Sequence, residues 1–120
     1  MANILVAEDD GNIRTIIAGI LTCQGHLVHE AADGVEAYSL AQKESYDLLV
    51  TDIEMPEKNG IELIKHLRSS MFNLAILAIS AGGIRDAGHC LDEAIECGAN
   101  QVLRKPFSKQ QLTSAVNTLL

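Results

Sequence analysis

Charged and hydroxyl side chains follow four short apolar segments of the sequence. Glu8, Asp9 and Asp10 follow "NILVA", Asp52 ends "LLVTD", Ser80 ends "LAILAIS", and Lys105 comes directly after "QVLR". If the first and third segments are neighbouring strands, their carboxylates lie close together and repel each other. Positive charge must compensate this repulsion, and we expect it from two sources. These are a hard divalent cation such as Mg²⁺, held by oxygen ligands, and the ammonium group of Lys105.

This set of groups is the one that phosphoryl transfer onto an aspartate requires. A carboxylate nucleophile, a hydroxyl, a lysine and a magnesium ion together stabilise the negative charge that spreads over the equatorial oxygens of the transition state. The run "LLVTDIEMP", residues 48–56, places Asp52 at the end of an apolar segment. The sequence therefore predicts that Asp52 is a nucleophile held rigidly by the apolar residues before it.

Five short apolar runs alternate with helical patterns along the chain, which is typical of an α/β fold with a parallel sheet. The central runs are nearly all apolar, as expected of strands covered on both faces. An open doubly wound sheet is the leading topology, and its binding sites lie beyond the carboxyl ends of the strands. The four polar sets should therefore meet at one edge. The predicted strands are residues 3–7, 27–30, 48–52, 74–80 and 101–104.

Apolar residues at helical spacing fill the intervals between these strands, and each stripe predicts one buried helix face. Ser108 and Gln111 form a capping-box pattern before the last helix, and Asp10 occupies the place of an N-cap. Gly25 and Gly98 stand where helices should end. The stripes are Ile13, Ile16, Ile17, Ile20 and Leu21; Ala37, Leu40 and Ala41; Ile61, Ile64 and Leu67; Ala87, Leu91, Ala94 and Ile95; and Leu112, Ala115, Val116 and Leu119.

Length and composition indicate one folded domain, residues 1–120, because 48% of the residues are hydrophobic and 21% are charged. The net charge of -7 argues against a direct contact with nucleic acid, whose phosphate backbone requires clustered Lys and Arg. The longest apolar run is too short to cross a bilayer, and no signal-peptide pattern opens the chain. We expect a cytoplasmic protein without a membrane partner.

The cysteines and histidines lack the spacing of a metal site or a disulfide framework. The three cysteines are odd in number and contain no CxxC pair, and the four histidines contain no HxxxH pattern. We interpret them as structural or surface residues. They are Cys23, Cys90, Cys97, His26, His29, His66 and His89.

Four motifs in this order resemble the receiver domains of bacterial two-component response regulators, over essentially the whole chain. They are "ILVAEDDGNIR", "LLVTDIEMPEKNGIEL", "ILAISA" and "VLRKPF". Each motif alone is weak, but the four together are highly specific. The resemblance implies a flavodoxin-like doubly wound (βα)5 fold, a three-layer sandwich around a five-stranded parallel sheet of order 2-1-3-4-5, as in the chemotaxis member of the family.

The resemblance also implies the roles of the site residues. Asp52 would take a phosphoryl group from a histidine of a partner kinase and become an acyl phosphate. Ser80 would donate its hydroxyl to one phosphoryl oxygen, and Lys105 would pair with another. A cis peptide bond before Pro106 would aim Lys105 inward. Such a chain is a signalling phosphoacceptor that catalyses only its own phosphorylation and dephosphorylation, not a turnover enzyme.

A magnesium site belongs to the same resemblance. Asp9 would bind Mg²⁺ directly and Glu8 would bind through water, a register that fits better than Asp9 with Asp10. Asp52 and the backbone carbonyl of Glu54 would complete the protein ligands, which leaves the Glu54 side chain free to vary. That side chain could orient a hydrolytic water or repel an approaching anion, and the sequence does not decide between these effects.

One position departs from the family pattern. Many receivers carry Tyr or Phe on the fifth strand, three residues before the lysine, and here that position is Val102. A β-branched side chain has few rotamers, so the aromatic switch should be absent. We expect activation to use another element, the loop from Ser80 through Gly82 and Gly83, because glycines leave a backbone mobile.

The implied partners are a sensor histidine kinase or a phosphotransfer protein, and a downstream output domain or protein. In the family, the face of the fourth helix, fifth strand and fifth helix docks partners or pairs two protomers in a homodimer. In this chain that face would carry Arg85, His89, Asp92, Glu96 and Gln101.

Three other functions fit the sequence less well. A magnesium-dependent phosphohydrolase with an Asp nucleophile, of the haloacid dehalogenase type, would carry DxD after its first strand, and no DxD occurs there. A nucleotide- or flavin-binding module would carry a glycine-rich phosphate loop at that point. A receiver that docks partners without phosphorylation would not need the Asp52, Ser80 and Lys105 set.

Overall fold

In the computed structural model, the chain forms a five-stranded parallel sheet of order β2-β1-β3-β4-β5. The structure describes residues 2–54, 59–70, 73–80, 95 and 97–120. The predicted strands agree with the observed ones to within one residue, and the strand order confirms the flavodoxin-like fold. The elements are β1 (Asn3–Ala7), α1 (Gly11–Cys23), β2 (Leu27–Ala31), α2 (Gly34–Lys43), β3 (Leu48–Asp52), α3 (Gly60–Arg68), β4 (Ala75–Ser80), β5 (Gln101–Arg104) and α5 (Lys109–Leu119).

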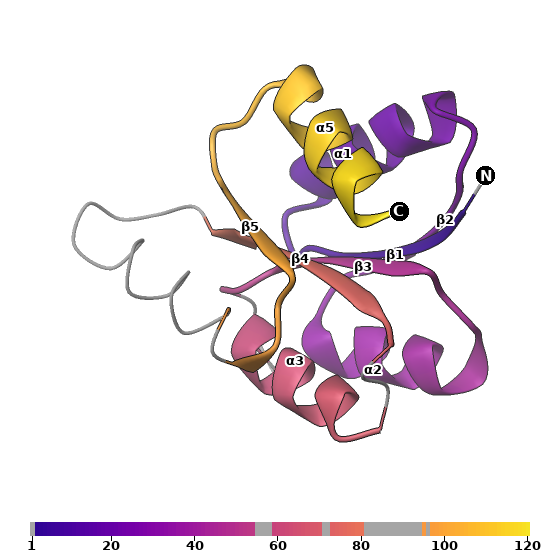
Figure 1. Cartoon of the computed structure of the whole chain (residues 1–120), viewed down its shortest axis with the longest axis vertical. Helices are drawn as coiled ribbons and strands as arrows, with labels where there is room; N and C mark the ends of the chain where they lie inside the picture. Colours follow the sequence, from indigo (N-terminus) through magenta and orange to yellow (C-terminus); the bar gives the residue numbers. More distant parts are fainter. Residues whose placement is uncertain (1, 55–58, 71–72, 81–94, 96) are drawn as a thin grey trace.

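The sheet lies between two layers of helices (Figure 1). Helices α1 and α5 cover one face, and α2 and α3 cover the other. Successive strand residues alternate between the two cores. Ile4 and Val6 of β1 pack with α1 and α5, whereas Leu5 packs with α2 and α3. Because both faces are covered, all five residues of β3 are buried, and this fixes the end of the strand in place.

The helix ends follow the predicted signals. Asp10 caps α1 by accepting two amide hydrogen bonds from the first turn. Ser108 and Gln111 form the expected capping box at the start of α5. Gly25 and Gly98 have φ angles of 92° and 126°, a left-handed conformation that favours glycine after a helix.

Two predicted core positions are instead exposed. Ile16 on α1 is 58% exposed although Ile17 and Leu21 beside it are buried, because Ile16 lies at the edge of the apolar stripe rather than at its centre. Ile95 is 46% exposed. The rest of the predicted helix 87–95 lies outside the described residues, as do Gly82, Gly83 and Cys90.

A polar cluster joins α3 to the amino ends of β4 and β5. Arg68 donates from Nε to the carbonyl of Gly98 at 2.8 Å and from Nη2 to Oδ1 of Asn100 at 2.7 Å. The same Oδ1 accepts the backbone amide of Ile76 at 2.8 Å, and the amide of Asn100 donates to the Ile76 carbonyl at 2.8 Å. We call these four residues, Arg68, Ile76, Gly98 and Asn100, the amino-end cluster. It stabilises the edge of the sheet opposite the candidate site.

The remaining sequence expectations concern surface and thiol chemistry. Cys23 and Cys97 are free thiols. His29 hydrogen-bonds through Nδ1 to the hydroxyl of Tyr46 at 2.7 Å, which is the kind of structural contact expected for it.

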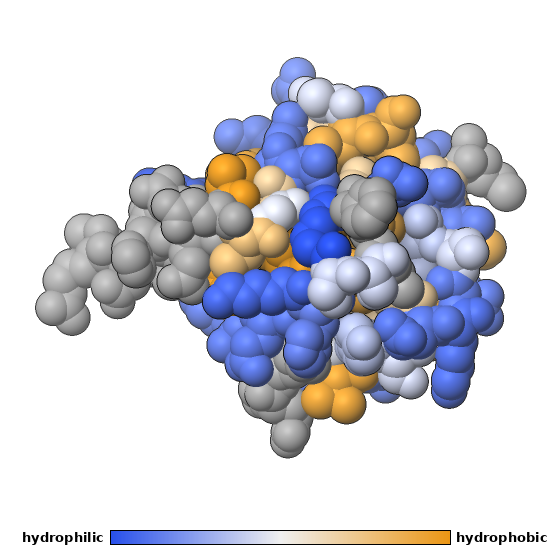
Figure 2. Space-filling view, turned by 60° about the horizontal axis from the view of Figure 1, so that its bottom comes forward, coloured by the Kyte–Doolittle hydropathy of each residue, from blue (hydrophilic) through white to orange (hydrophobic). Residues whose placement is uncertain are grey.

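The face in Figure 2 is mostly hydrophilic, with its hydrophobic residues in separate patches. None of the helices in the described part of the chain is long and apolar enough to cross a membrane.

Candidate functional site

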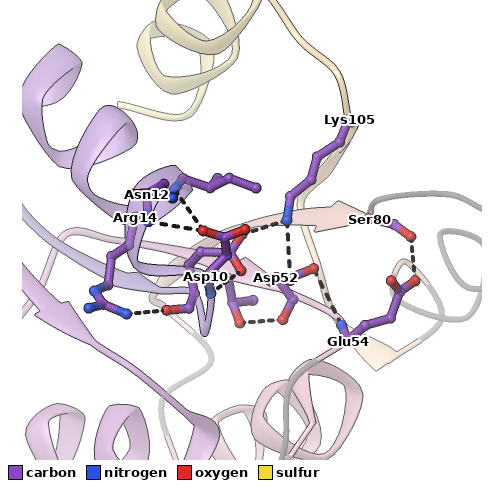
Figure 3. Close-up of polar contacts among 10 residues, drawn as sticks. Asp10, Asn12, Arg14, Asp52, Glu54, Ser80 and Lys105 are labelled. Carbon is purple, nitrogen blue, oxygen red and sulfur yellow. Dashed lines mark hydrogen bonds and ion pairs between the residues drawn. The ribbon is translucent and has the colours of Figure 1, made fainter.

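The carboxyl ends of four strands bring the predicted polar residues together (Figure 3). Glu8 follows β1, Asp52 ends β3, Ser80 ends β4 and Lys105 follows β5. The first three are almost fully buried, with 1%, 5% and 0% exposure. Lys105 reaches across the edge, and its Nζ donates to Oε1 of Glu8 and to Oδ2 of Asp52, the latter at 3.2 Å. The convergence expected from the sequence is therefore present.

The end of β1 is held at both backbone atoms of Glu8. Its amide donates to the carbonyl of Ala31 in β2 at 3.0 Å. Its carbonyl accepts Nη1 of Arg14 at 2.7 Å, and Nε of Arg14 pairs with Oε1 of Glu30 at 3.2 Å. The amide of Asp10 donates to Oε2 of the Glu8 side chain at 3.2 Å. The sequence did not indicate this role of Arg14, although its place one turn after the cap of α1 lets it reach back to β1.

The end of β3 is fixed by a close backbone approach. Thr51 donates its hydroxyl to the carbonyl of Asp52 at 2.9 Å. A Cβ atom on Gly60 would lie 2.3 Å from that same carbonyl oxygen and 2.6 Å from Cα of Ile53, so only glycine fits. The Gly60 amide also donates to the Ile53 carbonyl at 2.8 Å. Asn59 and Gly60 form an Asn-Gly pair, a common turn signal, and its glycine packs against the backbone of Asp52.

Glu54 contacts both Asp52 and Ser80, and the sequence alone had left the role of its side chain undecided. Its amide donates to Oδ1 of Asp52 at 3.3 Å, and its Oε1 accepts the hydroxyl of Ser80 at 2.9 Å. The backbone of Lys105 is tied to the same strand end, since its amide donates to the Ser80 carbonyl at 2.8 Å. The peptide bond between Lys105 and Pro106 is cis, which confirms the expectation from the sequence.

Glu8 and Asp9 are held in an environment that disfavours their charged forms. Burial raises the pKa of Glu8, and repulsion from Asp52 adds to this although Lys105 acts in the opposite direction. Burial and the neighbouring Glu8 raise the pKa of Asp9. Burial alone would lower the pKa of Lys105, but its hydrogen bond to Glu8 and its attraction to Asp52 outweigh burial and raise it. Lys105 therefore stays protonated at neutral pH.

The carboxylates offer a suitable set of ligands for a hard cation. One oxygen from each of Glu8, Asp9 and Asp52 lies within 4.8 Å of the others, the only such group among the described residues. Oxygen donors with net negative charge are what Mg²⁺ prefers. Lys105 pairs with two of the three carboxylates. Asp10 instead caps α1, as predicted.

Val102, which stands where many receivers have an aromatic residue, is half-buried. It packs against the core between the sheet and helices α2 and α3. Its side chain therefore contributes to that core. The loop expected to act in its place, beyond Ser80, lies outside the described residues.

Comparison with known sequences gives consistent matches along almost the whole chain. The sequence model of the response regulator receiver domain family matches residues 4–117. The chain is 34% identical over 117 residues to response regulator MprA of Mycobacterium leprae, covering 98% of this chain and 50% of MprA. It is 36% identical over 117 residues to the probable transcriptional regulatory protein SilR of Salmonella typhimurium, with 98% and 50% coverage. The chain thus spans about half the length of these relatives.

Solved structures agree with the sequence matches. The receiver domain of the Francisella response regulator 1452 superimposes with a TM-score of 0.89 and 34% identity, covering 99% of this chain and 96% of that one. The chemotaxis response regulator CheY4 of Vibrio cholerae superimposes with a TM-score of 0.91 and 31% identity, covering 100% and 99%.

Proposed function

Because the chain belongs to the response regulator receiver domain family, we propose that it receives a phosphoryl group on Asp52 in a two-component signalling system. The observation that carries this proposal is the arrangement of three groups at one sheet edge. The buried carboxylate of Asp52 lies 3.2 Å from Nζ of Lys105, and the hydroxyl of Ser80 ends the neighbouring strand. A nucleophile, a cation and a hydroxyl donor are thereby held by the rigid ends of buried strands.

In the proposed reaction, a carboxylate oxygen of Asp52 attacks the phosphorus of a phosphohistidine. The new O–P bond forms as the P–N bond breaks, and the electron pair of that bond stays on the imidazole nitrogen. Lys105 exchanges part of its contact with Glu8 and Asp52 for a phosphoryl oxygen, and Ser80 donates to another. Each group stabilises charge that grows during transfer. Phosphorylation then changes how the domain binds its partners.

We propose that Glu8, Asp9, Asp52 and the backbone carbonyl of Glu54 hold Mg²⁺. When bound, Mg²⁺ supplies positive charge to the carboxylates and to the phosphoryl oxygens. The support is the oxygen group within 4.8 Å, together with the pKa values of Glu8 and Asp9, which burial and the neighbouring carboxylates raise. Asp9 is exposed at the edge of the group, where an ion can enter.

A sensor histidine kinase or a phosphotransfer protein is the proposed phosphoryl donor. A recess of about 470 Å³ next to Lys105 is lined by Ile13, Ile16, Pro106 and Phe107. Apolar side chains beside a charged site suit a protein donor, because they let it bury surface while its histidine reaches Asp52. The exposure of Ile16, which the core does not use, fits this role.

The downstream partner is proposed to be an output domain or protein. The chain spans about half the length of the relatives above, so an output region in the same protein is one form of this partner. Of the five residues named for the face proposed for partner docking or a homodimer, only Gln101 on β5 lies within the described residues. We further propose a cytoplasmic location and a signalling role that catalyses only the chain's own phosphorylation and dephosphorylation.

The proposal is tested by intact-mass analysis after incubation with acetyl phosphate and Mg²⁺. The parent should gain the mass of one phosphoryl group, and Asp52→Asn should gain none. Asp47→Asn is the matched control, since Asp47 is an exposed aspartate before β3, at the opposite end of that strand. It should be phosphorylated like the parent. Equal gain by Asp52→Asn and the parent, or no gain by the folded parent, would overturn the proposal.

A further inference from the structure

The hydroxyl of Ser80 is already engaged in the unphosphorylated protein. It donates to Oε1 of Glu54 at 2.9 Å, as the close-up shows (Figure 3). Ser80 is fully buried, and a serine hydroxyl has a single proton to donate. A phosphoryl oxygen can therefore receive this hydrogen bond only after the Glu54 carboxylate has released it.

We propose that the Glu54 carboxylate is an internal competitor of the phosphoryl group, which holds Ser80 in the resting protein and slows phosphorylation of Asp52. This inference rests on the proposed function and assigns a positioning residue to the same site. It replaces the two alternatives left open by the sequence, water orientation and simple repulsion, with competition for one hydrogen-bond donor.

The geometry gives Glu54 the properties of such a competitor. Its backbone amide is anchored on Oδ1 of Asp52 at 3.3 Å, so the start of its side chain stays beside the nucleophile. Its carboxylate carries the same kind of charge and the same acceptor atoms as a phosphoryl oxygen. Glu54 as a whole is exposed, so its carboxylate regains water when it leaves Ser80. Release is therefore a side-chain rotation.

Competition differs from simple repulsion in its dependence on Ser80. A repelling charge at position 54 would act whether or not the hydroxyl is present, because Coulomb repulsion needs no shared partner. A competitor loses its effect once the contested donor is removed. A double-mutant cycle between the two positions separates these mechanisms.

The test measures initial rates of phosphorylation by acetyl phosphate and Mg²⁺ for the parent, Glu54→Gln, Ser80→Ala and the double variant. Glu54→Gln should raise the parent rate about fivefold, since a neutral amide binds the hydroxyl more weakly than a carboxylate does. In the Ser80→Ala background the same change should raise the rate less than about twofold. Glu44→Gln is the matched control, since Glu44 is an exposed glutamate before β3, and it should leave the rate unchanged.

A second, equilibrium measurement uses beryllofluoride with Mg²⁺, which occupies the phosphoryl position without covalent chemistry. Glu54→Gln should bind it about fivefold more tightly than the parent, for the same reason. An equal rate increase in both backgrounds, or no increase in either rate or beryllofluoride affinity, overturns the inference while the phosphoacceptor proposal stands. If the folded parent is not phosphorylated at all, both fail.

Discussion

The two ends of the sheet each hold a partly buried cation, but the cations meet different partners. At the amino end, Arg68 donates to neutral oxygens of Gly98 and Asn100, and the same amide side chain also satisfies the backbone of Ile76. At the carboxyl end, Lys105 contacts two carboxylates. Among the described residues, the first arrangement pairs its cation with neutral oxygens. The second collects more negative charge than Lys105 neutralises.

This difference separates a structural cluster from a site. Hydrogen bonds from a cation to neutral oxygens contribute to stability at any metal concentration. Three carboxylates held close together repel each other, and this repulsion lowers the stability of the fold until a cation binds them. The raised pKa values of Glu8 and Asp9 reflect this repulsion together with burial. The comparison can be tested by changing matched residues at the two ends.

Replacing the two cationic side chains, Lys105 and Arg68, should have the largest effect on the free energy of unfolding. Without metal, Lys105→Met should lower the free energy of unfolding by about 3 kcal/mol, because it leaves buried carboxylates unpaired. Arg68→Met leaves neutral oxygens unpaired and should cost about 2 kcal/mol. Mg²⁺ should restore a large part of the loss in the first variant and none in the second. Urea unfolding with EDTA and with Mg²⁺ measures both.

Lys43→Met is the control for the loss of a surface lysine, because Lys43 is exposed in the last turn of α2. It should change the stability by less than about 0.5 kcal/mol. An equal Mg²⁺ response in the Lys105 and Arg68 variants would show that the two ends do not differ as described.

Alanine substitution of Gly60 and Gly98, the two glycines packed tightly against neighbouring atoms, should give the next largest losses of stability. Gly60→Ala forces Cβ against the Asp52 carbonyl, and Gly98→Ala combines a φ of 126° with a contact 2.6 Å from Cγ of Arg68. Each should lower the free energy of unfolding by about 2 kcal/mol. Gly60→Ala should also slow phosphorylation about 100-fold through displacement of Asp52, whereas Gly98→Ala should leave the rate unchanged.

Gly19 provides a matched control within α1. Apart from its chain neighbours and the nearby backbone of α1, no atom of the described residues lies within 4 Å of a Cβ built there, so Gly19→Ala should stabilise the helix by about 0.5–1 kcal/mol. Chemical unfolding gives the stabilities, and acetyl phosphate incorporation gives the rates. A folded Gly60→Ala variant that is phosphorylated as fast as the parent would contradict the placement of Asp52 by this contact.

A neutral side chain of the amino-end cluster should have a smaller effect. Asn100→Ala removes the acceptor of both Arg68 and the Ile76 amide, and should cost about 1–2 kcal/mol. The loss should be the same with and without Mg²⁺, and phosphorylation should be unaffected once the variant is folded. A changed phosphorylation rate at a temperature well below its unfolding midpoint would show that the two ends are coupled.

The smallest change in metal-free stability should come from Asp9, and it should be a gain, unlike the losses expected for the other changes to the site and the amino-end cluster. Asp9→Asn removes a charge that raises the repulsion in the cluster, and should raise the metal-free free energy of unfolding by about 0.5 kcal/mol after allowance for its exposure. It should also remove the stabilisation by Mg²⁺, about 1.4 kcal/mol in the parent at ten times the dissociation constant. Thermal unfolding with and without Mg²⁺ tests both signs.

The pH dependence of the Asp9 variant sharpens this test. The folded pKa of Asp9 lies above its ordinary value of 3.8, so folded protein keeps a proton that the unfolded chain has already lost. The contribution of Asp9 to stability is therefore greatest below that value and is lost as the pH rises through the folded pKa. The advantage of Asp9→Asn over the parent should grow over the same range. An advantage that shrinks with rising pH would contradict the assigned cause.

The sequence predicted most of the fold because its signals are local. The strand limits follow from apolar runs, and the caps at Asp10 and Ser108 follow from single residue types at helix starts. Parallel strands put their carboxyl ends at one edge, so the meeting of Glu8, Asp52 and Lys105 followed from topology.

The features that the sequence did not predict depend on how side chains and loops approach each other. The Ser80 to Glu54 hydrogen bond depends on rotamers, and the Arg14 contact with the Glu8 carbonyl depends on how α1 docks on β1. The need for glycine at position 60 arises from a close approach of two backbones, although the same dipeptide is also a common turn signal. The exposure of Ile16 reflects the width of the buried stripe.

The pairing of β3 with its two neighbours has one further consequence. Thr51 is aligned with Ala7 of β1, and Asp52 with Ile79 of β4. Side chains alternate along a strand, so a slip of one residue would turn Asp52 to the opposite face of the sheet. A chain that is phosphorylated on Asp52 must therefore have assembled its strands in the correct alignment. Labelling with acetyl phosphate would then count correctly folded molecules in a mixed population, so the chemistry doubles as a measure of folding quality.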